Sequence, residues 1–361
     1  MADITKINIG DTFKDFDSAK INIGDAWKDV ESIQINIGDS WKDVLLAIAG
    51  WDVSTASYDS KSVDVSDEDT SPRGLFFKPD GTKMYVTGGQ HETVYQYTLS
   101  TAWDVSTASY ASKYKDISSQ DTVPFGLFFK PDGTKMYIIG YINDTVYQYT
   151  LSTAWDVSTA SYNSKYKSVN SQDAKPLGVF FKPDGTKMYI VGNDNDTVYQ
   201  YTLSTAWDVS TASYDSKSKD VGSEDTAPLG VFFKPDGTKM YIVGNTNDTV
   251  YQYALSTAWD VSTASYDSKY KDVSDEDTTP KGIYFKPDGF KMYIMGVEDN
   301  DTVYQYTLST AWDVSTASYD SKSIDVSSED AYSSSVFFKP DGFKMYITDY
   351  GNDTVYQYSI S

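Results

Sequence analysis

One octapeptide recurs six times along most of this chain. The sequence Trp-Asp-Val-Ser-Thr-Ala-Ser-Tyr begins at Trp51, Trp103, Trp155, Trp207, Trp259 and Trp312, so successive copies are 52 or 53 residues apart. A second marker, Lys-Pro-Asp-Gly, recurs in step, with its proline at Pro79, Pro131, Pro183, Pro235, Pro287 and Pro340. Self-similarity at a fixed period indicates a repeat architecture in which each repeat is one supersecondary unit. The chain therefore contains six copies of one structural unit.

Each unit has the pattern of four short β-strands. In the first unit, residues 75–78 precede a Pro-Asp-Gly turn, residues 83–87 follow it, and residues 93–99 alternate with a period of two. After a loop, the more polar run 109–117 is typical of an outer edge strand. Four strands per unit, with glycine and aromatic residues at fixed offsets, predict propeller blades. The predicted fold class is all-β, a six-bladed β-propeller with four strands per blade.

The repeat also resembles a known family. Residues 76–87 read Phe-Phe-Lys-Pro-Asp-Gly-Thr-Lys-Met-Tyr-Val-Thr, and Thr-Val-Tyr-Gln-Tyr follows from Thr93. This is similar to the YVTN-type β-propeller repeats, which share a Ser-Pro-Asp-Gly core and a later Thr-Val strand. The resemblance covers residues 51–361 and implies the architecture, but that family includes surface, binding and enzymatic members. The chain departs from the family in its longer loop, whose Trp-Asp does not end a third strand as the WD40 dipeptide does.

The frame of the repeat predicts how the ring closes. The propeller begins with a fourth-strand segment, residues 57–65, and ends after a third strand, residues 354–360. The N-terminal segment should therefore complete the blade that the C-terminal strands build. This pairing removes a free sheet edge, which would otherwise be a site for aggregation.

Residues 1–50 carry a different repeat, with a period of 14. Its core, Ile-Asn-Ile-Gly-Asp-x-(Trp/Phe)-Lys-Asp, occurs within residues 6–15, 20–29 and 34–43. Each copy predicts a small β-hairpin that turns at Gly-Asp. Because an isolated hairpin is at best marginally stable, the three copies should pack on each other, on a second chain or on a larger particle. We therefore expect two domains: a β-repeat module for attachment or oligomerisation (1–50) and the propeller (51–361).

The short repeats resemble the Ile-x-Ile-Gly-x-x-Trp-Lys-x-Val repeats of bacteriophage tail and other structural proteins. The match covers residues 6–44. It implies a virion component in which a small N-terminal module attaches a larger distal domain. The alternative is a leader that merely extends a propeller.

Charge and composition exclude several classes of function. Lys plus Arg is 30 and Asp plus Glu is 52, a net charge of −22, which argues against binding to nucleic-acid phosphate or to an anionic membrane. The chain has no cysteine and one histidine, so it has no thiol nucleophile, no cysteine zinc site and no multi-histidine metal site. No cofactor motif is present. Neither a signal peptide nor a membrane-spanning run is apparent, so we expect synthesis in a cytoplasm and no membrane insertion.

The six copies differ mainly in two connections, before the first strand and between the second and third strands. Connections alternate between the two ends of an up-and-down blade, so both variable connections should lie on one face of the disc. A binding surface on loops over a rigid scaffold would vary in this way, and drift at exposed loop tips is the alternative. The candidate binding residues are Arg73, His91, Glu92, Phe125, Tyr141, Leu177, Asp194, Leu229, Thr246, Lys281, Glu298, Tyr332 and Tyr350.

An aspartate precedes the first strand of every unit. These residues are Asp69, Asp121, Asp173, Asp225, Asp277 and Asp330. A cation site would use such carboxylates, but sixfold repetition favours Asx-turn hydrogen bonds that fix each loop, so we expect no metal. For the same reason the repeated tryptophans favour packing onto a neighbouring blade over stacking on sugars. His91 stands in a variable loop and is interpreted as a solvated side chain rather than a general base.

The blades are so alike that a channel site built from different residues is not visible, and we therefore expect no catalytic residues and no enzymatic activity. The leading hypothesis is a phage tail, fibre or decoration protein located in the virion, or otherwise in the cytoplasm. Residues 1–50 would bind other virion proteins or a second copy of the chain, and the variable face would bind a partner protein or a host surface glycan. The alternative is an enzyme of lactonase or glycan-hydrolase type with its site at the mouth of the central channel. A third possibility is a purely structural propeller.

Overall fold

The computed structural model describes residues 20–23, 26–29, 33–37, 40–44, 50–192, 194–296, 301–329 and 332–361. The chain divides into two compact units, Met1–Ala49 and Gly50–Ser361, and each is described by itself. Across the described ranges, no helix is long and apolar enough to cross a membrane.

In the N-terminal unit, the second and third copies of the 14-residue repeat form β-hairpins. Strand β1 (Lys20–Ile23) pairs antiparallel with β2 (Ala26–Asp29), and β3 (Ile33–Ile37) pairs with β4 (Ser40–Val44). Each chain reversal falls between the paired residues that flank Gly-Asp, as the pattern predicts. The first copy, residues 6–15, lies outside the described residues.

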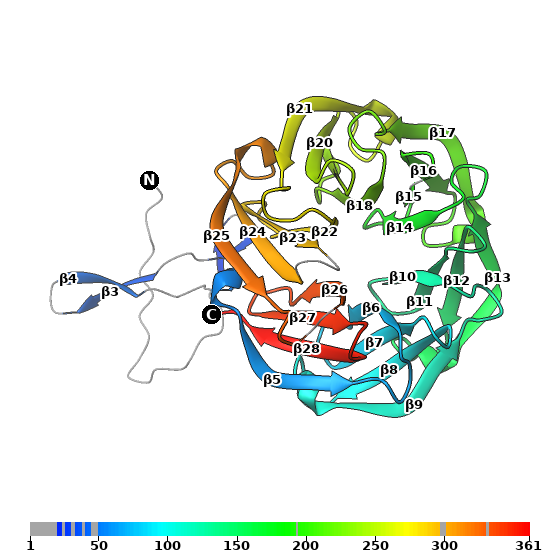
Figure 1. Ribbon diagram of the computed structural model, residues 1–361, viewed down its shortest axis with the longest axis horizontal. Helices are drawn as coiled ribbons and strands as arrows, with labels where there is room; N and C mark the ends of the chain where they lie inside the picture. Colours follow the sequence, from blue (N-terminus) through cyan, green and yellow to red (C-terminus); the bar gives the residue numbers. More distant parts are fainter. Residues whose placement is uncertain are drawn as a thin grey trace. The chain divides into compact units, whose positions relative to one another are not determined.

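The second unit is a ring of six four-stranded antiparallel sheets (Figure 1). Blade 1 comprises β6 (Pro72–Phe77), β7 (Lys83–Gly88), β8 (Thr93–Leu99) and β9 (Ala108–Asp116). Blade 2 comprises β10 (Pro124–Phe129), β11 (Lys135–Gly140), β12 (Thr145–Leu151) and β13 (Ala160–Ser168). Blade 3 comprises β14 (Pro176–Phe181), β15 (Lys187–Gly192), β16 (Thr197–Leu203) and β17 (Ala212–Asp220).

Blades 4 to 6 follow the same order from the inner to the outer strand. Blade 4 comprises β18 (Pro228–Phe233), β19 (Lys239–Gly244), β20 (Thr249–Leu255) and β21 (Ala264–Asp272). Blade 5 comprises β22 (Pro280–Phe285), β23 (Lys291–Gly296), β24 (Thr302–Leu308) and β25 (Ala317–Asp325). Blade 6 comprises β26 (Ser333–Phe338), β27 (Lys344–Asp349), β28 (Thr354–Ser359) and β5 (Ser57–Asp64).

The ring closes as the sequence predicts. Strand β5, from the N-terminal end of the propeller, pairs antiparallel with β28 from the C-terminal end, with Tyr58 opposite Tyr358 (Figure 1). The two ends of the unit also meet, because the amide of Gly50 lies 3.4 Å from the carbonyl oxygen of Ser361. The prediction of an all-β, six-bladed propeller with four strands per blade is therefore confirmed.

A one-turn 3₁₀ helix precedes every outer strand. In each, an aspartate caps the turn by accepting a hydrogen bond from the amide two residues later, as Asp104 does from Ser106 at 3.2 Å. The six helices are η1 (Val53–Thr55), η2 (Val105–Thr107), η3 (Val157–Thr159), η4 (Val209–Thr211), η5 (Val261–Thr263) and η6 (Val314–Thr316). These turns hold the Trp-Asp-Val-Ser-Thr segment of the repeat.

The tryptophan of each loop packs between two blades. Trp155 of blade 2 stacks on Phe76 of blade 1, with ring centroids 6.3 Å apart, and contacts Phe129 of its own blade at 5.4 Å. Its carbonyl oxygen accepts a hydrogen bond of 2.8 Å from the hydroxyl of Tyr85 in blade 1. A buried aromatic ring removes about 150–250 Å² from water, on the order of 4–6 kcal/mol at about 25 cal/mol/Å². The prediction that these tryptophans serve packing is confirmed.

Polar contacts join the same neighbours. The amide of Val157 in blade 2 donates to Oε1 of Gln96 in blade 1 at 3.0 Å, inside the protein. On the outside, Lys113 of blade 1 forms an ion pair with Asp156 of blade 2. Each blade therefore fixes the 3₁₀ turn of the next one through a ring contact, a hydrogen bond and an ion pair.

Candidate functional site

The two variable connections lie side by side in blades 1, 2, 4 and 6. The amide of Gly89, after β7, donates to the carbonyl oxygen of Ser71, before β6, at 2.8 Å, and Tyr141 and Val123 make the same bond in blade 2 at 3.1 Å. The six copies of this loop pair make up the face that we call the variable face. The structure thus places the two kinds of variable loop on one face, as up-and-down topology requires.

The repeated aspartates hold these loops together. Asp69 is fully buried, and its carboxylate accepts hydrogen bonds from the amides of Ser71 (2.8 Å), Gln90 (3.2 Å) and His91 (2.9 Å). A Cβ on Gly88 would lie 2.0 Å from Oδ2 of Asp69, so only glycine fits there. The aspartate therefore ties the connection before the first strand to the connection after the second strand.

The equivalent aspartates of blades 2 to 5 are buried in the same way. Amides bond to Asp121 from Val123 at 2.7 Å, to Asp173 from Lys175 at 2.8 Å, to Asp225 from Ala227 at 2.8 Å, and to Asp277 from Thr279 at 2.8 Å. Asp330 lies outside the described residues. These contacts are the Asx-turn hydrogen bonds that the sixfold repetition predicts.

The residues present do not fit a metal ion of the kind that the lactonase alternative would use. In the part of the chain that the structure describes, no group of three or more His, Cys, Asp or Glu side chains is placed to hold a metal ion. The buried aspartates are already engaged by main-chain amides. We therefore derive no step through a metal.

Some of the candidate binding residues come together across blades 1 and 2. The guanidinium carbon of Arg73 lies 5.7 Å from the ring centroid of Phe125, and the ring of Phe125 is tilted against that of Tyr141 with centroids 5.3 Å apart. Phe125 is 42% exposed. In blade 3, Lys175 forms an ion pair of 3.1 Å with Asp194. The variable face thus carries a short cation–aromatic cluster over blades 1 and 2.

Other candidates remain apart from this cluster. His91 is exposed, and its Nδ1 lies 3.1 Å from the carbonyl oxygen of Glu68 and 3.5 Å from Oδ2 of Asp69. The hydroxyl of Thr246 contacts that of Thr226 at 3.2 Å. Leu177 and Leu229 are half-buried at the start of β14 and β18, Glu92 is half-buried, and Tyr332 and Tyr350 are exposed in blade 6. Glu298 lies outside the described residues.

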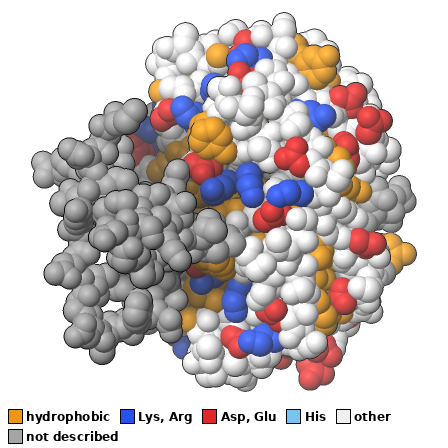
Figure 2. Space-filling model, turned by 90° about the vertical axis from the view of Figure 1, so that its left-hand side faces the viewer, with side chains coloured by type: hydrophobic (Ala, Val, Ile, Leu, Met, Phe, Trp, Pro, Cys, Tyr) orange, Lys and Arg blue, Asp and Glu red, His pale blue; other side chains and the backbone are white. Residues whose placement is uncertain are grey.

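Figure 2 shows acidic and basic side chains interspersed on one side of the molecule, with no large patch of either sign there.

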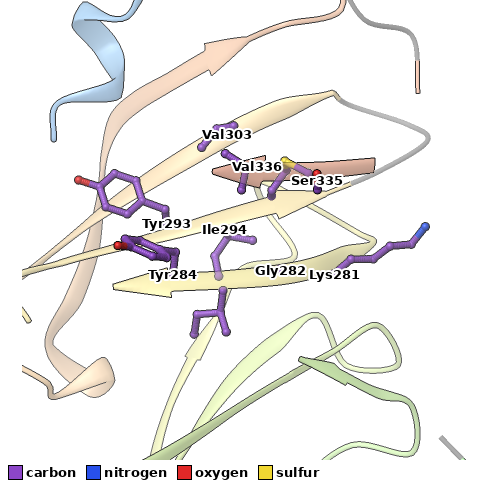
Figure 3. A pocket seen from close by; sticks show the side chains of 10 residues that line it. Lys281, Gly282, Tyr284, Tyr293, Ile294, Val303, Ser335 and Val336 are labelled. Carbon is purple, nitrogen blue, oxygen red and sulfur yellow. The ribbon is translucent and has the colours of Figure 1, made fainter. Parts of the chain in front are cut away.

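A cavity of about 270 Å³ lies between blades 5 and 6 (Figure 3). Its lining includes Lys281, Gly282 and Tyr284 of β22, Met295 of β23, and Ser335 of β26. The inner strands β22 and β26 are in looser contact than the other neighbouring inner strands. A Cβ added to Gly282 would meet no atom within 4 Å, whereas each of its four equivalents, Gly74, Gly126, Gly178 and Gly230, has a neighbour within that distance.

Four side chains of this cavity differ from those at the same positions in all other blades. Lys281 replaces Arg73, Phe125, Leu177, Leu229 and Ser334; Tyr284 replaces five phenylalanines; Met295 replaces Thr, Ile or Val; and Ser335 replaces five glycines. Variation among the loops points to Lys281 alone and does not reveal changes within strands. Tyr284, Met295 and Ser335 could have been found by comparing the strands of the six blades and noting each position where one blade carries a different residue from the other five.

Two polar side chains stand among the apolar side chains of the lining. In Figure 3 Lys281 and Tyr284 lie on opposite sides of Ile294, Val303 and Val336, with the amine and the hydroxyl pointing away from these apolar groups. The ring of Tyr284 stacks on Trp51 at 5.9 Å, which fixes its orientation. Burial raises the pKa of Tyr284, so its hydroxyl stays protonated at neutral pH and can donate a hydrogen bond.

The two remaining hydroxyls that line the cavity already have partners. The hydroxyl of Tyr293 donates to the carbonyl oxygen of Trp51. The hydroxyl of Ser335 lies 3.2 Å from that of Thr348. Lys281 and Tyr284 are the further polar side chains that line the cavity.

Comparison with known proteins gives the fold and no family. No family model matches the chain, and no curated protein matches it. Among solved structures, a periplasmic gluconolactonase from Pseudomonas aeruginosa is similar with a TM-score of 0.53 at 13% identity, covering 80% of this chain and 81% of the other. A luciferin-regenerating enzyme has a TM-score of 0.54 at 11% identity, covering 83% and 94%. The Cps50 (Swd1) propeller domain of Myceliophteria thermophila has a TM-score of 0.52 at 10% identity, covering 85% and 100%.

These similarities correct one expectation from the sequence. The structures that the propeller resembles include proteins named as a lactonase and as another enzyme, which contradicts the expectation that the chain is not an enzyme. That expectation depended on the likeness of the blades, from which four side chains of one interblade cavity depart. The comparisons give no support to a similarity between the N-terminal repeats and phage proteins.

Proposed function

We propose that the propeller is an enzyme that hydrolyses a small lactone in the cavity between blades 5 and 6. The observation that carries this proposal is that four blade-specific side chains, those of Lys281, Tyr284, Met295 and Ser335, gather on one cavity. The similarity in fold to a gluconolactonase suggests the class of reaction. Within a nearly uniform ring, these four departures line one hollow.

The size and lining of the cavity favour a single small ring as substrate. Its volume of about 270 Å³ is close to the lower end of the range of ligand pockets, about 300–1,000 Å³. The apolar side chains Ile294, Val303 and Val336 can pack on ring carbons. Lys281 and Tyr284 supply an amine and a phenol to the lining, and either group can donate a hydrogen bond to a carbonyl oxygen.

Hydrolysis of a lactone adds one water molecule across the acyl carbon–oxygen bond. Water attacks the carbonyl carbon, the ring carbon–oxygen bond breaks, and a proton from the water passes to the leaving oxygen to give a hydroxy acid. Negative charge develops on the carbonyl oxygen during the attack, and a donor from Tyr284 or Lys281 stabilises it there. Among the described residues that line the cavity there is no carboxylate and no histidine to serve as a general base. Water therefore attacks unassisted, and a modest rate is expected.

The test uses D-glucono-1,5-lactone and γ-butyrolactone, with acid release followed in a pH-stat. We expect the full chain to release acid faster than buffer alone with at least one of them. Tyr284→Phe and Lys281→Leu install residues that other blades carry at these positions, so both variants should fold. Removing one oxyanion donor in an enzyme costs about 10²–10³ in kcat, and a loss of at least tenfold is expected here.

Lys175→Leu is the control, because Lys175 is a lysine of the variable face that does not line the cavity. It should leave the rate unchanged. A full chain that hydrolyses both lactones no faster than buffer would contradict the proposal. So would an activity that survives both Tyr284→Phe and Lys281→Leu.

A further inference from the structure

A second hollow lies on the rim of blade 2, away from the cavity between blades 5 and 6. This open groove of about 310 Å³ is lined by Gln120 and Asn143 from the connections of the variable face and by Tyr147, Tyr162 and Tyr166 from strands β12 and β13. Amide and hydroxyl groups thus stand beside aromatic rings in one hollow. Neither the sequence analysis nor the proposed lactone site uses it.

Hydrogen bonds fix the side-chain amides of Gln120 and Asn143 in the groove. Oε1 of Gln120 accepts a hydrogen bond of 2.8 Å from the hydroxyl of Tyr149, and the carbonyl oxygen of Gln120 accepts one of 2.6 Å from Nδ2 of Asn143. Within the described residues, Nε2 of Gln120 donates to no protein group. The groove therefore offers a fixed amide donor from Gln120 and an amide acceptor, Oδ1, from Asn143.

The aromatic side of the groove is partly rigid and partly exposed. Tyr162 is held edge-on to Tyr147, with centroids 6.0 Å apart, and is tilted against Tyr149 at 5.7 Å. Tyr166 is 51% exposed. Tyrosine supplies a large contact area with few rotatable bonds, so ordering such a ring on binding costs little conformational entropy.

Charged side chains near the groove make contacts of their own: the amine of Lys115 of β9, for example, lies 5.7 Å from the ring centroid of Tyr149. Lys165 of β13 pairs with Asp208, and the amine of Lys167 lies over the ring of Tyr201 in blade 3 at 5.6 Å. Asp121 is buried and bonded to main-chain amides. Among the residues that the structure describes, no charged side chain lines the groove itself. An ionic ligand would lose water there without gaining a partner, which is costly.

Blade 2 alone combines a glutamine at the position of Gln120 with an exposed tyrosine at the position of Tyr166. Blade 4 has the exposed ring, Tyr270, but carries Glu224 in place of the glutamine, and blade 1 likewise has Tyr114 with Glu68. Blade 3 has Gln172 but Ser218 at the position of the exposed ring. The remaining two blades have glutamate and serine at these positions, namely Glu276 with Ser323 and Glu329 with Ser62.

We propose that the groove of blade 2 binds one unit of a neutral saccharide. A sugar ring has an apolar carbon–hydrogen face that can lie on Tyr166 and a hydroxyl edge that needs both donors and acceptors. Gln120 supplies the donor and Asn143 the acceptor. In blades 1 and 4 the glutamate places a negative charge in the hollow and offers no donor there. The site is distinct from the lactone cavity, and either proposal can fail without the other.

The test measures binding of three neutral probes to the full chain by isothermal titration calorimetry: maltohexaose, cellohexaose and the hexamer of N-acetylglucosamine. We expect at least one to bind with a stoichiometry of one per chain. Tyr166→Ser, which copies blade 3, should weaken that binding at least tenfold. Tyr270→Ser, the same change in blade 4, should leave it unchanged. If no probe binds at millimolar concentration, or if the two variants weaken binding equally or not at all, the proposal is overturned.

A gain-of-function variant makes the test sharper. Glu224→Gln gives blade 4 the lining of blade 2, with Asn247 and Tyr270 already in place. The stoichiometry should then rise from one to two per chain, whereas a stoichiometry that stays at one would contradict the assigned role of Gln120. Lactone hydrolysis, if present, should be unaffected by Tyr166→Ser.

Discussion

The main-chain amide of Val53 donates a hydrogen bond to Oε1 of Gln305, 3.0 Å away and 252 residues further along the chain. The contact lies inside the propeller, where it joins the segment before β5 to blade 5. The same bond joins each of the other neighbouring blades, between Val105 and Gln357, Val157 and Gln96, Val209 and Gln148, Val261 and Gln200, and Val314 and Gln252. The N-terminal segment is thus paired within blade 6 and bonded to blade 5 as well.

Replacing these glutamines should destabilise the ring to different degrees. Gln357 bonds at both ends of its amide, to Val105 and, through Nε2, to Asp59 at 2.8 Å, whereas Nε2 of Gln305 is buried and finds no partner among the described residues. Gln357→Leu should therefore lower the free energy of unfolding by about 1–3 kcal/mol. Gln305→Leu should cost less, because it also removes an unsatisfied donor. Urea denaturation of both variants checks this, and an equal loss would contradict it.

Replacing two glycines by alanine should change the free energy of unfolding by very different amounts. At Gly237, φ is +72°, and an added Cβ would lie 2.4 Å from the ring of Trp259, so Gly237→Ala must displace that ring. Left-handed backbone costs an L residue about 1–2 kcal/mol, and disturbed core packing adds to it, for a total loss of about 3 kcal/mol or more. Gly282→Ala meets open space and should change stability by less than about 1 kcal/mol. Thermal unfolding of the two variants compares them, and similar losses would refute the packing argument.

The sequence allows most of a blade to be predicted, because strand patterns are local. The third strand of blade 1 was expected at residues 93–99 and is Thr93–Leu99. The first was expected at 75–78 and is Pro72–Phe77: it begins earlier, because a proline is tolerated as the first residue of a strand, and it ends before Lys78, whose amide bonds across the turn to Lys83. The 3₁₀ turn Val105–Thr107 was missed, since its cap by Asp104 acts over only two residues.

The candidate site could be predicted only in part, for a physical reason. The role of Asp69 followed from sixfold repetition, since a residue used in every blade serves the fold. The cavity beside Gly282 depends on how closely β22 and β26 approach each other, a distance between blades that no local pattern contains. The sequence shows that Tyr284 and Ser335 differ from the residues at the same positions of the other blades. It does not show that blades 5 and 6 bring the two residues to one cavity.

Acid should weaken the contacts between blades. Burial raises the pKa of Asp208, but the hydrogen bond and charge of Lys165 outweigh it, so the pKa is lower than the usual 3.8. A carboxyl group with a lowered pKa in the folded state contributes stability above its unfolded pKa, and this stability is lost as the pH falls through the folded value. Stability should therefore decline below about pH 3.8. Asp208→Asn should make the decline shallower, as measured by urea denaturation between pH 2 and pH 6; an unchanged slope would contradict this assignment.

Ring closure by β5 should decide whether the propeller folds cooperatively. A chain of residues 50–361 keeps β5, the stack of Trp51 on Tyr284 and the ion pair of Lys61 with Asp104, and we expect it to melt in one transition. A chain of residues 66–361 loses all three contacts and exposes the edge of β28. Loss of a buried tryptophan alone costs about 3–5 kcal/mol, a large part of the 5–15 kcal/mol that stabilises a typical domain. The shorter chain should therefore melt at a clearly lower temperature, and a synthetic peptide of residues 50–65 should restore part of the loss by binding at the open edge. Equal melting temperatures for the two chains would show that β5 is not needed for closure, whereas a loss that the peptide restores would identify the missing pairing as its cause.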